Sequence, residues 1–164
     1  RDNDPVMFFE HKMLYTTKFN DVPEVEEDVC IPFGRARIVA EGADITVVTN
    51  SMMTIKAEKA VRQLQKEGIS AELIDLRTIV PLDTETIIRS VKKTGKLLIV
   101  DEGHLSFGIT GEIASRIMPD VFYDLDAPIQ RMGTADVPLP FSPALEFPLI
   151  PDEKKIAAKI REMV

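Results

Sequence analysis

Cysteine and histidine are scarce in this chain of 164 residues, which has one cysteine, Cys30, and two histidines, His11 and His104. A single cysteine excludes an intrachain disulfide and a metal cluster held by cysteines, and two histidines exclude a metal site built from several imidazoles. A magnesium site made of carboxylates alone stays open. Scarce cysteine is typical of a reducing compartment, so we expect the cytoplasm, or the mitochondrial matrix in a eukaryote.

Long apolar runs and an excess of basic charge are also missing. No stretch of 18 apolar residues occurs, and the opening R-D-N-D has no signal-peptide character, so we expect neither a transmembrane helix nor a leader. The net charge of −7 argues against a general nucleic-acid surface, because phosphate binding depends on clustered Lys and Arg. It fits a small-molecule enzyme or a protein that docks a basic partner. A first residue other than Met indicates a piece of a longer polypeptide.

From residue 32 onward the sequence alternates between strand and helix patterns. β-Branched or apolar runs predict strands at residues 32–40, 45–49, 71–80, 97–100 and 129–133. Apolar residues at helical spacing predict helices at residues 54–67, 83–93, 108–118 and 152–164. The prolines between them predict an ordered surface strap at residues 136–151. This order predicts an α/β fold, a three-layer α/β/α domain with a mainly parallel five-stranded sheet and with residues 97–100 as its central strand.

The first 31 residues do not follow this alternation. Residues 6–9, V-M-F-F, predict a short strand that either adds to the main sheet or belongs to an upstream domain, and we favour the upstream domain. Residues 11–31 lack periodicity and carry an acidic run at residues 24–28 beside Pro23, which is typical of a solvated linker. We therefore expect a short strand and a linker from an upstream domain before the α/β domain begins at residue 32.

Residues 96–111, K-L-L-I-V-D-E-G-H-L-S-F-G-I-T-G, have the order of a buried strand, a polar loop and a glycine-marked helix start. Open α/β sheets place ligand sites in such loops, at the carboxyl ends of strands. His104 and Ser106 could form a base–nucleophile pair, which would make the protein a self-contained hydrolase. However, no G-x-S-x-G elbow is present, and sequence neighbours in a loop rarely point at one another. The alternative is that this loop lines an interface, or the mouth of another subunit's site.

Anion binding is a further possibility. Gly103, Gly108 and Gly111 do not form G-x-G-x-x-G, and no P-loop signature occurs, so no nucleotide motif supports it. Arg77 and Arg131 lie near strand ends, and either could hold an anionic group together with the loop at residues 101–108, which would make the protein an independent small-anion-binding α/β module. The glycines favour close backbone approach instead, for example between two helix starts across a two-fold axis.

Several segments together resemble one protein family. They are A-E-L-I-D-L-R-T-I-V-P-L-D-T-E-T-I-I-R-S-V-K-K-T-G-K-L-L-I-V-D-E-G-H, F-G-I-T-G-E-I-A-S-R-I, L-D-A-P-I-Q-R and V-P-L-P-F-S-P-A-L-E. In these segments the chain is similar to the transketolase C-terminal-like domain that ends the beta subunit of thiamine diphosphate-dependent 2-oxoacid and acetoin dehydrogenases. The opening P-V-M-F-F-E and M-L-Y resemble the end of that family's pyrimidine-binding domain. The resemblance therefore implies two parts, residues 1–31 as the end of the pyrimidine-binding domain with its linker, and residues 32–164 as the transketolase C-terminal-like domain.

The resemblance implies that this chain serves assembly rather than chemistry. In the family, the amino-terminal half of the beta subunit carries the activating glutamate, the aromatic stack and the catalytic histidine, and the alpha subunit holds the diphosphate and Mg²⁺. We therefore expect thiamine diphosphate and Mg²⁺ in the intact enzyme and none bound to this chain alone. No catalytic, cofactor-binding or metal-binding residue is assigned within it. The V-P-L-P-F-S-P-A-L-E segment leans toward the acetoin branch, with pyruvate next.

The same resemblance implies three partners and neither nucleic acid nor membrane. The partners are the alpha subunit, a second beta subunit around a two-fold axis, and the basic subunit-binding domain of the acyltransferase component. The resemblance places docking of that last domain at Asp126, in the L-D-A-P turn, and at the carboxyl-terminal helix. The residues expected at interfaces are Asp101, Glu102, His104, Phe107, Gly108, Gly111 and Asp126. The anion-binding module and the hydrolase stay open beside this expectation.

Overall fold

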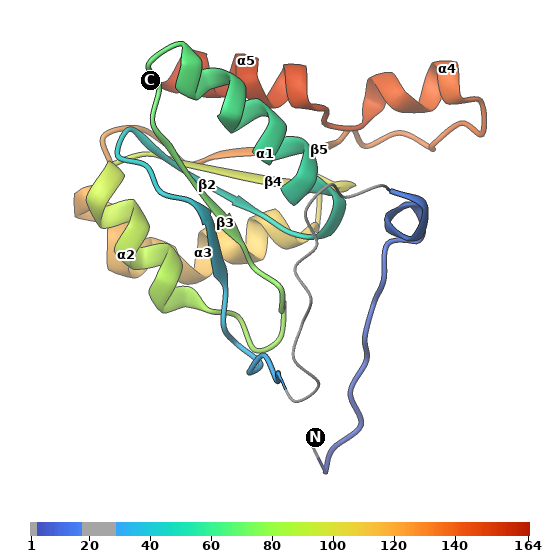
Figure 1. The fold of residues 1–164 in the computed structure, drawn as a ribbon, viewed down its shortest axis with the longest axis horizontal. Helices are drawn as coiled ribbons and strands as arrows, with labels where there is room; N and C mark the ends of the chain where they lie inside the picture. Colours follow the sequence, from blue (N-terminus) through green and yellow to red (C-terminus); the bar gives the residue numbers. More distant parts are fainter. Residues whose placement is uncertain (1–2, 18–28) are drawn as a thin grey trace.

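The sheet has five strands in the order β1-β3-β2-β4-β5 in the computed structural model, which describes residues 3–17 and 29–164 (Figure 1). The strands are β1 (Arg37–Ala40), β2 (Ile45–Thr49), β3 (Ala71–Asp75), β4 (Leu97–His104) and β5 (Gln130–Thr134). The edge strand β1 pairs antiparallel with β3, and all the other pairings are parallel. The predicted mainly parallel sheet is therefore confirmed.

Helices cover both faces of this sheet, which confirms the predicted three-layer α/β/α architecture. One face carries α1 (Ser51–Lys66) and α5 (Glu153–Met163), and the opposite face carries α2 (Thr84–Thr94) and α3 (Ile109–Val121) (Figure 1). Shorter helical turns are η1 (Lys12–Thr16), η2 (Phe122–Asp124), α4 (Pro143–Glu146) and η3 (Phe147–Leu149). The last two lie within the predicted proline-rich strap.

Successive strand residues feed two separate cores, because side chains of a strand alternate between the faces of a sheet. In β2, Val47 packs in the core beneath α1 and α5, whereas Val48 packs in the core beneath α2 and α3. Leu98 and Ile99 of β4 divide in the same way. Apolar runs without alternating polar residues are buried on both faces for this reason.

Two predicted aspartate caps fix where helices start. The Asp83 carboxylate accepts from the Thr86 amide at 3.1 Å, and Asp152 accepts from the Lys155 amide at 2.8 Å. At the other end of α2, Gly95 has a φ of 68°, a left-handed conformation that a glycine adopts without a Cβ clash. These local signals explain why the predicted limits of α2 and α5 agree closely with the structure.

Other limits differ from the prediction. β4 continues through the predicted polar loop to His104, because His104 lies in register with Thr134 of β5. The central strand is β2, and residues 97–100 were wrongly expected there. β3 ends at Asp75, five residues before the predicted end, and α1 begins at Ser51, three residues before its predicted start.

The predicted short strand at residues 6–9 is wrong for the chain as described. No strand forms there, and Val6, Met7, Phe8 and Phe9 are exposed, because no neighbouring strand offers backbone partners. The turn η1 follows within the predicted linker. The acidic run at residues 24–28 lies outside the described residues. The division at residues 31 and 32 stays a prediction.

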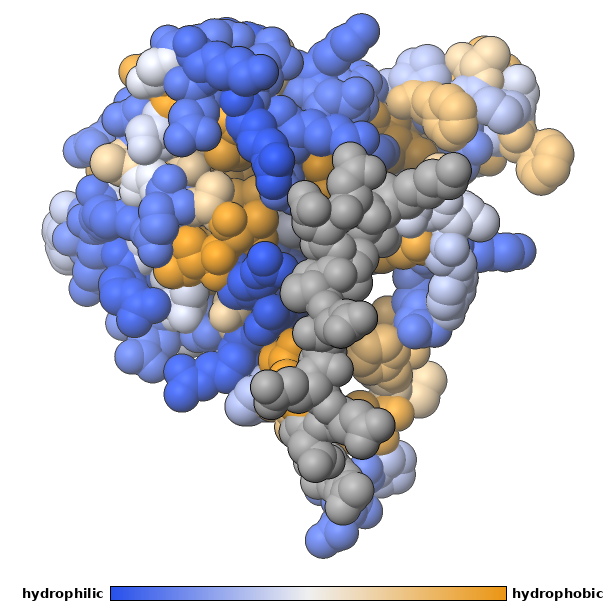
Figure 2. Space-filling view, in the orientation of Figure 1, coloured by the Kyte–Doolittle hydropathy of each residue, from blue (hydrophilic) through white to orange (hydrophobic). Residues whose placement is uncertain are grey.

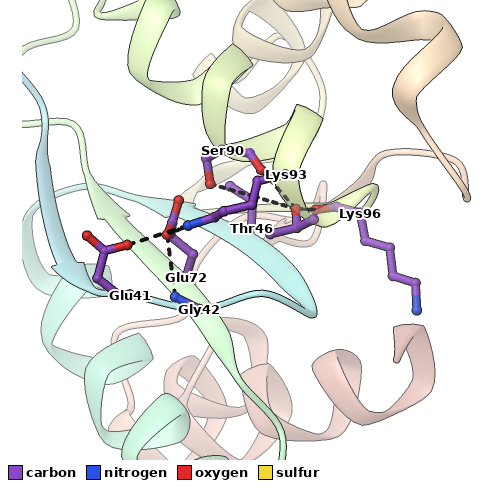
Figure 3. A network of polar contacts seen from close by, with 8 residues as sticks. Glu41, Gly42, Thr46, Glu72, Ser90, Lys93 and Lys96 are labelled. Atoms are coloured by element: carbon purple, nitrogen blue, oxygen red, sulfur yellow. Dashed lines mark hydrogen bonds and ion pairs between the residues drawn. The ribbon is translucent and has the colours of Figure 1, made fainter.

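A buried polar network joins α2 to the amino-terminal ends of β2 and β3 (Figure 3). The Thr46 hydroxyl hydrogen-bonds those of Ser90 and Thr94, each at 2.7 Å. Beside them, Lys93 donates to the carboxylate of Glu72, whose side chain is only 2% exposed. Burial alone would raise the pKa of Glu72, but hydrogen bonds from Lys93 and Ser90 outweigh it and hold this pKa below its ordinary value.

Candidate functional site at the carboxyl edge of the sheet

The loops that follow β2, β3 and β4 lie at one edge of the sheet, since these strands run parallel. A non-glycine residue in the left-handed region follows each of these strands: Ser51, the first residue of α1, with a φ of 48°, Arg77 with 58° and Phe107 with 56°. Each such conformation costs about 1–3 kcal/mol and persists only where the surroundings determine it. Such strained residues cluster at functional sites, so this carboxyl edge is the candidate site.

The loop after β4 is fixed by hydrogen bonds to the chain that follows β5. The ring Nδ1 of His104 donates to the Ala135 carbonyl at 2.9 Å. Asp136 accepts from both the amide and the hydroxyl of Ser106, at 3.2 and 2.5 Å. Directly after these contacts, the side chain of Phe107 is fully exposed. The loop is therefore rigidly held while it presents an aromatic ring to solvent.

Gly108 explains the tight path of this loop. A Cβ at Gly108 would lie 2.1 Å from the His104 carbonyl oxygen, a distance that a non-glycine residue could not reach without moving the backbone. Glycine therefore allows the start of α3 to approach β4 closely. The space around Gly111 is less restricted than that around Gly108. A Cβ added at Gly111 would lie 3.0 Å from Nη1 of the Arg131 side chain.

Asp136 carries the main electrostatic feature of the loop. Hydrogen bonds from the hydroxyl and the amide of Ser106, with a smaller contribution from His104, hold the pKa of Asp136 below its ordinary value. The Ser106 hydroxyl thus has an ionised acceptor, and His104 is directed to Ala135 instead. The serine and histidine are not paired, so the geometry gives no support to the hydrolase hypothesis.

The two arginines considered for anion binding do not share a site. Arg131 donates to the Leu105 carbonyl at 3.2 Å and so supports the loop after β4. Arg77 instead lines a cleft of about 700 Å³ between the loops after β2 and β3 and the N-terminal segment, with Phe9, Tyr15 and Phe33 among its walls. Neither Arg131 nor any residue of 101–108 lines this cleft.

The acidic residues at the end of β4 have local partners. The Glu102 carboxylate lies 2.8 Å from Nε2 of His11, and this contact ties the N-terminal segment to this edge. Asp101 accepts from the Gly103 amide at 2.9 Å. Both carboxylates therefore stabilise the edge itself.

Asp126 lies apart from the other predicted interface residues. Its amide donates to the Gly95 carbonyl at 2.8 Å, just before β4 begins, so it sits at the amino edge of the sheet. Nearby, Lys96 donates to the carbonyl of Val164 at 3.3 Å. The structure thus brings Asp126 and the end of α5 to one edge, and residues 101–111 to the other.

Sequence reasoning missed Asp136, the residue that organises the loop. The parallel pairing of β4 with β5 could have indicated this contact. His104 lies in register with Thr134, so the residues just beyond the ends of the two strands lie close together. Among the described residues, no group of three or more His, Cys, Asp or Glu could hold a metal ion. The described helices include none long and apolar enough to cross a membrane.

Comparison with known proteins gives one family and several relatives. The family model "Transketolase, C-terminal domain" matches residues 34–156. The chain is 47% identical over 163 residues to the "Pyruvate dehydrogenase E1 component subunit beta" of Rickettsia felis, covering 99% of the chain and 49% of the relative. It is 44% identical over 162 residues to the "Acetoin:2,6-dichlorophenolindophenol oxidoreductase subunit beta" of Cupriavidus necator, covering 99% and 47%.

A solved structure shares the fold. It is titled "Split gene transketolase, inactive beta4 tetramer", with a TM-score of 0.70, 27% identity, and coverage of 87% of this chain and 45% of that one. The chain spans about half the length of the curated relatives it matches.

Proposed function

Because the chain belongs to the transketolase C-terminal domain family, we propose that it is the assembly and partner-docking domain of the beta subunit of a thiamine diphosphate-dependent 2-oxoacid or acetoin dehydrogenase. The observation that carries this proposal is the identity of 47% and 44% to two proteins named as beta subunits, each over 99% of the chain. Pyruvate and acetoin relatives match almost equally well, so the proposed substrate class includes both. The cytoplasm or the mitochondrial matrix is the proposed location.

We propose that the cofactor of such an enzyme is held outside this chain. A diphosphate with Mg²⁺ needs oxygen ligands for the metal and cations for the phosphates. At the carboxyl edge, Asp136 is held by Ser106 and Arg131 by the Leu105 carbonyl. No metal-binding cluster occurs in the described parts of the chain. The proposal therefore leaves thiamine diphosphate and Mg²⁺ to the rest of the enzyme and treats the isolated chain as inactive.

The two edges of the sheet suit two kinds of contact. At the carboxyl edge, Phe107 and the start of α3 are proposed to meet the second beta subunit and the alpha subunit. At the amino edge, Asp126 and the end of α5 are proposed to dock the basic subunit-binding domain of the acyltransferase component. The rigid loop around Phe107 supports the first assignment, because a fixed aromatic side chain loses little entropy on binding.

A paired experiment tests the proposed function. Calorimetry of the isolated chain with thiamine diphosphate and Mg²⁺ should show no binding. The full beta subunit, co-expressed with the alpha subunit, should oxidise pyruvate or acetoin with an artificial electron acceptor. Tight, Mg²⁺-dependent cofactor binding by the isolated chain would contradict the assembly role.

The cleft beside Arg77 favours a small-anion-binding module as a second candidate, with Arg77 but without the loop at residues 101–108. It combines one arginine with aromatic walls in a volume typical of small-molecule sites. A thermal-shift series with phosphate, pyrophosphate and sulfate tests it, with Arg77→Met as the matched variant. A bound ligand raises apparent stability by mass action, so the absence of any shift would exclude this candidate.

A further inference from the structure

Arg77 lines the cleft described above, and its guanidinium has no partner in the described part of the chain. No hydrogen bond or ion pair within residues 3–17 and 29–164 involves this side chain, although its backbone amide donates to the Asp75 carboxylate at 3.2 Å. A guanidinium can form two parallel hydrogen bonds with a carboxylate, which is a strong and directional contact. The cleft therefore offers one arginine to a carboxylate that the chain itself does not supply.

The loop that carries Arg77 is held in place on both sides. The Thr78 hydroxyl donates to the Pro81 carbonyl and accepts from the Gly34 amide, each at 3.0 Å. The Leu76 amide donates to the Thr49 carbonyl at 2.9 Å, which ties the start of the loop to β2. A loop fixed in this way binds a ligand at a low cost in conformational entropy.

The remaining charged groups of the cleft are two carboxylates and one histidine. The carboxylates belong to Glu10 and Asp75, and Nε2 of His11 lies 2.8 Å from the Glu102 carboxylate. A phosphate or sulfate dianion would be attracted by Arg77 and repelled by both carboxylates, so it should bind weakly. A ligand that carries an ammonium beside its carboxylate complements both signs of charge.

The positions of these groups favour an α-amino acid. Its ammonium and carboxylate are bonded to the same carbon, so they need a cation and a carboxylate that lie close together. Arg77 and Asp75 meet this requirement, because they belong to one bend that is closed by the hydrogen bond between them. Glu10 is less suitable, since it already accepts from the Tyr15 hydroxyl.

Aromatic side chains form the walls around these charges. They are Phe8, Phe9, Tyr15 and Phe33, and Phe8 and Phe9 are largely exposed to solvent. Figure 2 shows apolar colours along the N-terminal segment that forms one of these walls. Aromatic rings make favourable offset or edge-on contacts with other rings. A ligand with an aromatic ring would therefore cover apolar surface that now faces water.

We propose that this cleft binds an aromatic α-amino acid, with its carboxylate on Arg77, its ammonium on Asp75 and its ring against the aromatic walls. The volume of about 700 Å³ is typical of sites for small molecules. This inference rests on the second candidate function, the small-anion-binding module. It goes further by naming the chemical class of the ligand.

The test is isothermal titration calorimetry of the complete chain with phenylalanine and three analogues that each lack one feature. The analogue 3-phenylpropionate lacks the ammonium, phenethylamine lacks the carboxylate, and alanine lacks the ring. Phenylalanine should bind with the lowest Kd, and each analogue should bind about tenfold or more weakly, because each leaves one group of the cleft without a partner.

Two variants assign the contacts. Arg77→Met should raise the Kd for phenylalanine about tenfold or more and leave that for phenethylamine unchanged. Asp75→Asn keeps an oxygen that can accept from the Arg77 amide but removes the charge, so it should weaken phenylalanine and not 3-phenylpropionate. The matched control is Arg89→Met, which removes an exposed arginine from α2, outside the cleft, and should change no Kd. Circular dichroism melts confirm that each variant folds.

Three results would overturn the inference, and they differ from one another. Binding of 3-phenylpropionate as tight as that of phenylalanine would show that the ammonium is not recognised, and the small-anion-binding module would remain. Equal affinity of Arg77→Met and the unmodified chain for phenylalanine would exclude Arg77 as the partner of the carboxylate. Failure of every ligand, inorganic anions included, would exclude the second candidate as well, whereas the assembly role is tested separately by turnover with the alpha subunit.

Discussion

The hydroxyl of Ser106 donates to the carboxylate of Asp136 at 2.5 Å, across 30 residues of sequence. This bond joins the loop after β4 to the segment that follows β5. The neighbouring bond from His104 to the Ala135 carbonyl reinforces the same connection. The loop that presents the ring of Phe107 and the segment that follows β5 are therefore held together at one point.

Replacing Ser106 should change the acidity of Asp136. The Ser106 hydroxyl and amide lower the pKa of this carboxyl, so Ser106→Ala should raise it toward its ordinary value of 3.8. Because the folded-state pKa is depressed, the stabilisation is present above the unfolded pKa and is lost as the pH falls through the folded pKa. Carboxyl ¹³C NMR titration measures the change. Ser115→Ala, on the exposed side of α3, is the control, and equal pKa values in all three proteins would refute the assignment.

Lys93→Met should destabilise the domain by about 1–3 kcal/mol at pH 7, because it leaves the Glu72 carboxylate buried without its cation. The pKa of Glu72 is lowered and that of Lys93 is raised. Their mutual stabilisation is therefore present between the ordinary values of 4.5 and 10.5, and it is lost below and above the respective folded pKa values. Urea unfolding should show that Lys93→Met lowers the free energy of unfolding less at pH 4 than at pH 7.

The matched control for that substitution is the neighbouring residue. Lys92 lies 3.8 Å from Asp124 with both side chains well exposed, and such surface pairs contribute about 0–1 kcal/mol. Lys92→Met should therefore change the free energy of unfolding much less. A similar loss in both variants would show that general charge, rather than the buried carboxylate, determines the effect.

Two buried threonines should respond in opposite directions to valine. The Thr110 hydroxyl is buried and has no hydrogen-bond partner within the described part of the chain, so Thr110→Val should stabilise by about 0.5–1.5 kcal/mol. The Thr134 hydroxyl donates to the Glu102 carbonyl at 2.6 Å, and Thr134→Val should cost about 1 kcal/mol or more. Urea unfolding compares them, and a loss of stability in Thr110→Val would reveal a partner for that hydroxyl.

Local patterns predicted much of this fold because the cause of each element lies within it. The aspartates at 83 and 152 cap helices through their own next turn. The run at residues 45–49 is apolar enough to be buried on both faces wherever it sits in a sheet. The order of the strands in the sheet has no such local cause, because it depends on which helix covers which face. The central strand is therefore β2 rather than the predicted β4.

Long-range pairing explains what the sequence could not supply. The polar residues after Val100 read as a loop, but pairing with β5 extends β4 as far as His104. The partner of Ser106 was missed because Asp136 follows a different strand. Asp126 was predicted to lie at an interface together with residues 101–111, yet the antiparallel course of α3 against β4 carries the chain to the opposite edge of the sheet.

His104→Ala should weaken assembly more than chemistry. The imidazole donates to the Ala135 carbonyl and so holds the Phe107 loop against the segment that follows β5, while the proposed cofactor lies in other parts of the enzyme. We expect the concentration needed for assembly to rise about five- to tenfold, and kcat of the assembled enzyme to stay within about twofold. Ultracentrifugation and turnover at saturating subunit concentration separate the two quantities. His104→Asn can still donate to Ala135 and should recover most of the loss, whereas reduced turnover in a fully assembled enzyme would assign His104 to the chemistry instead.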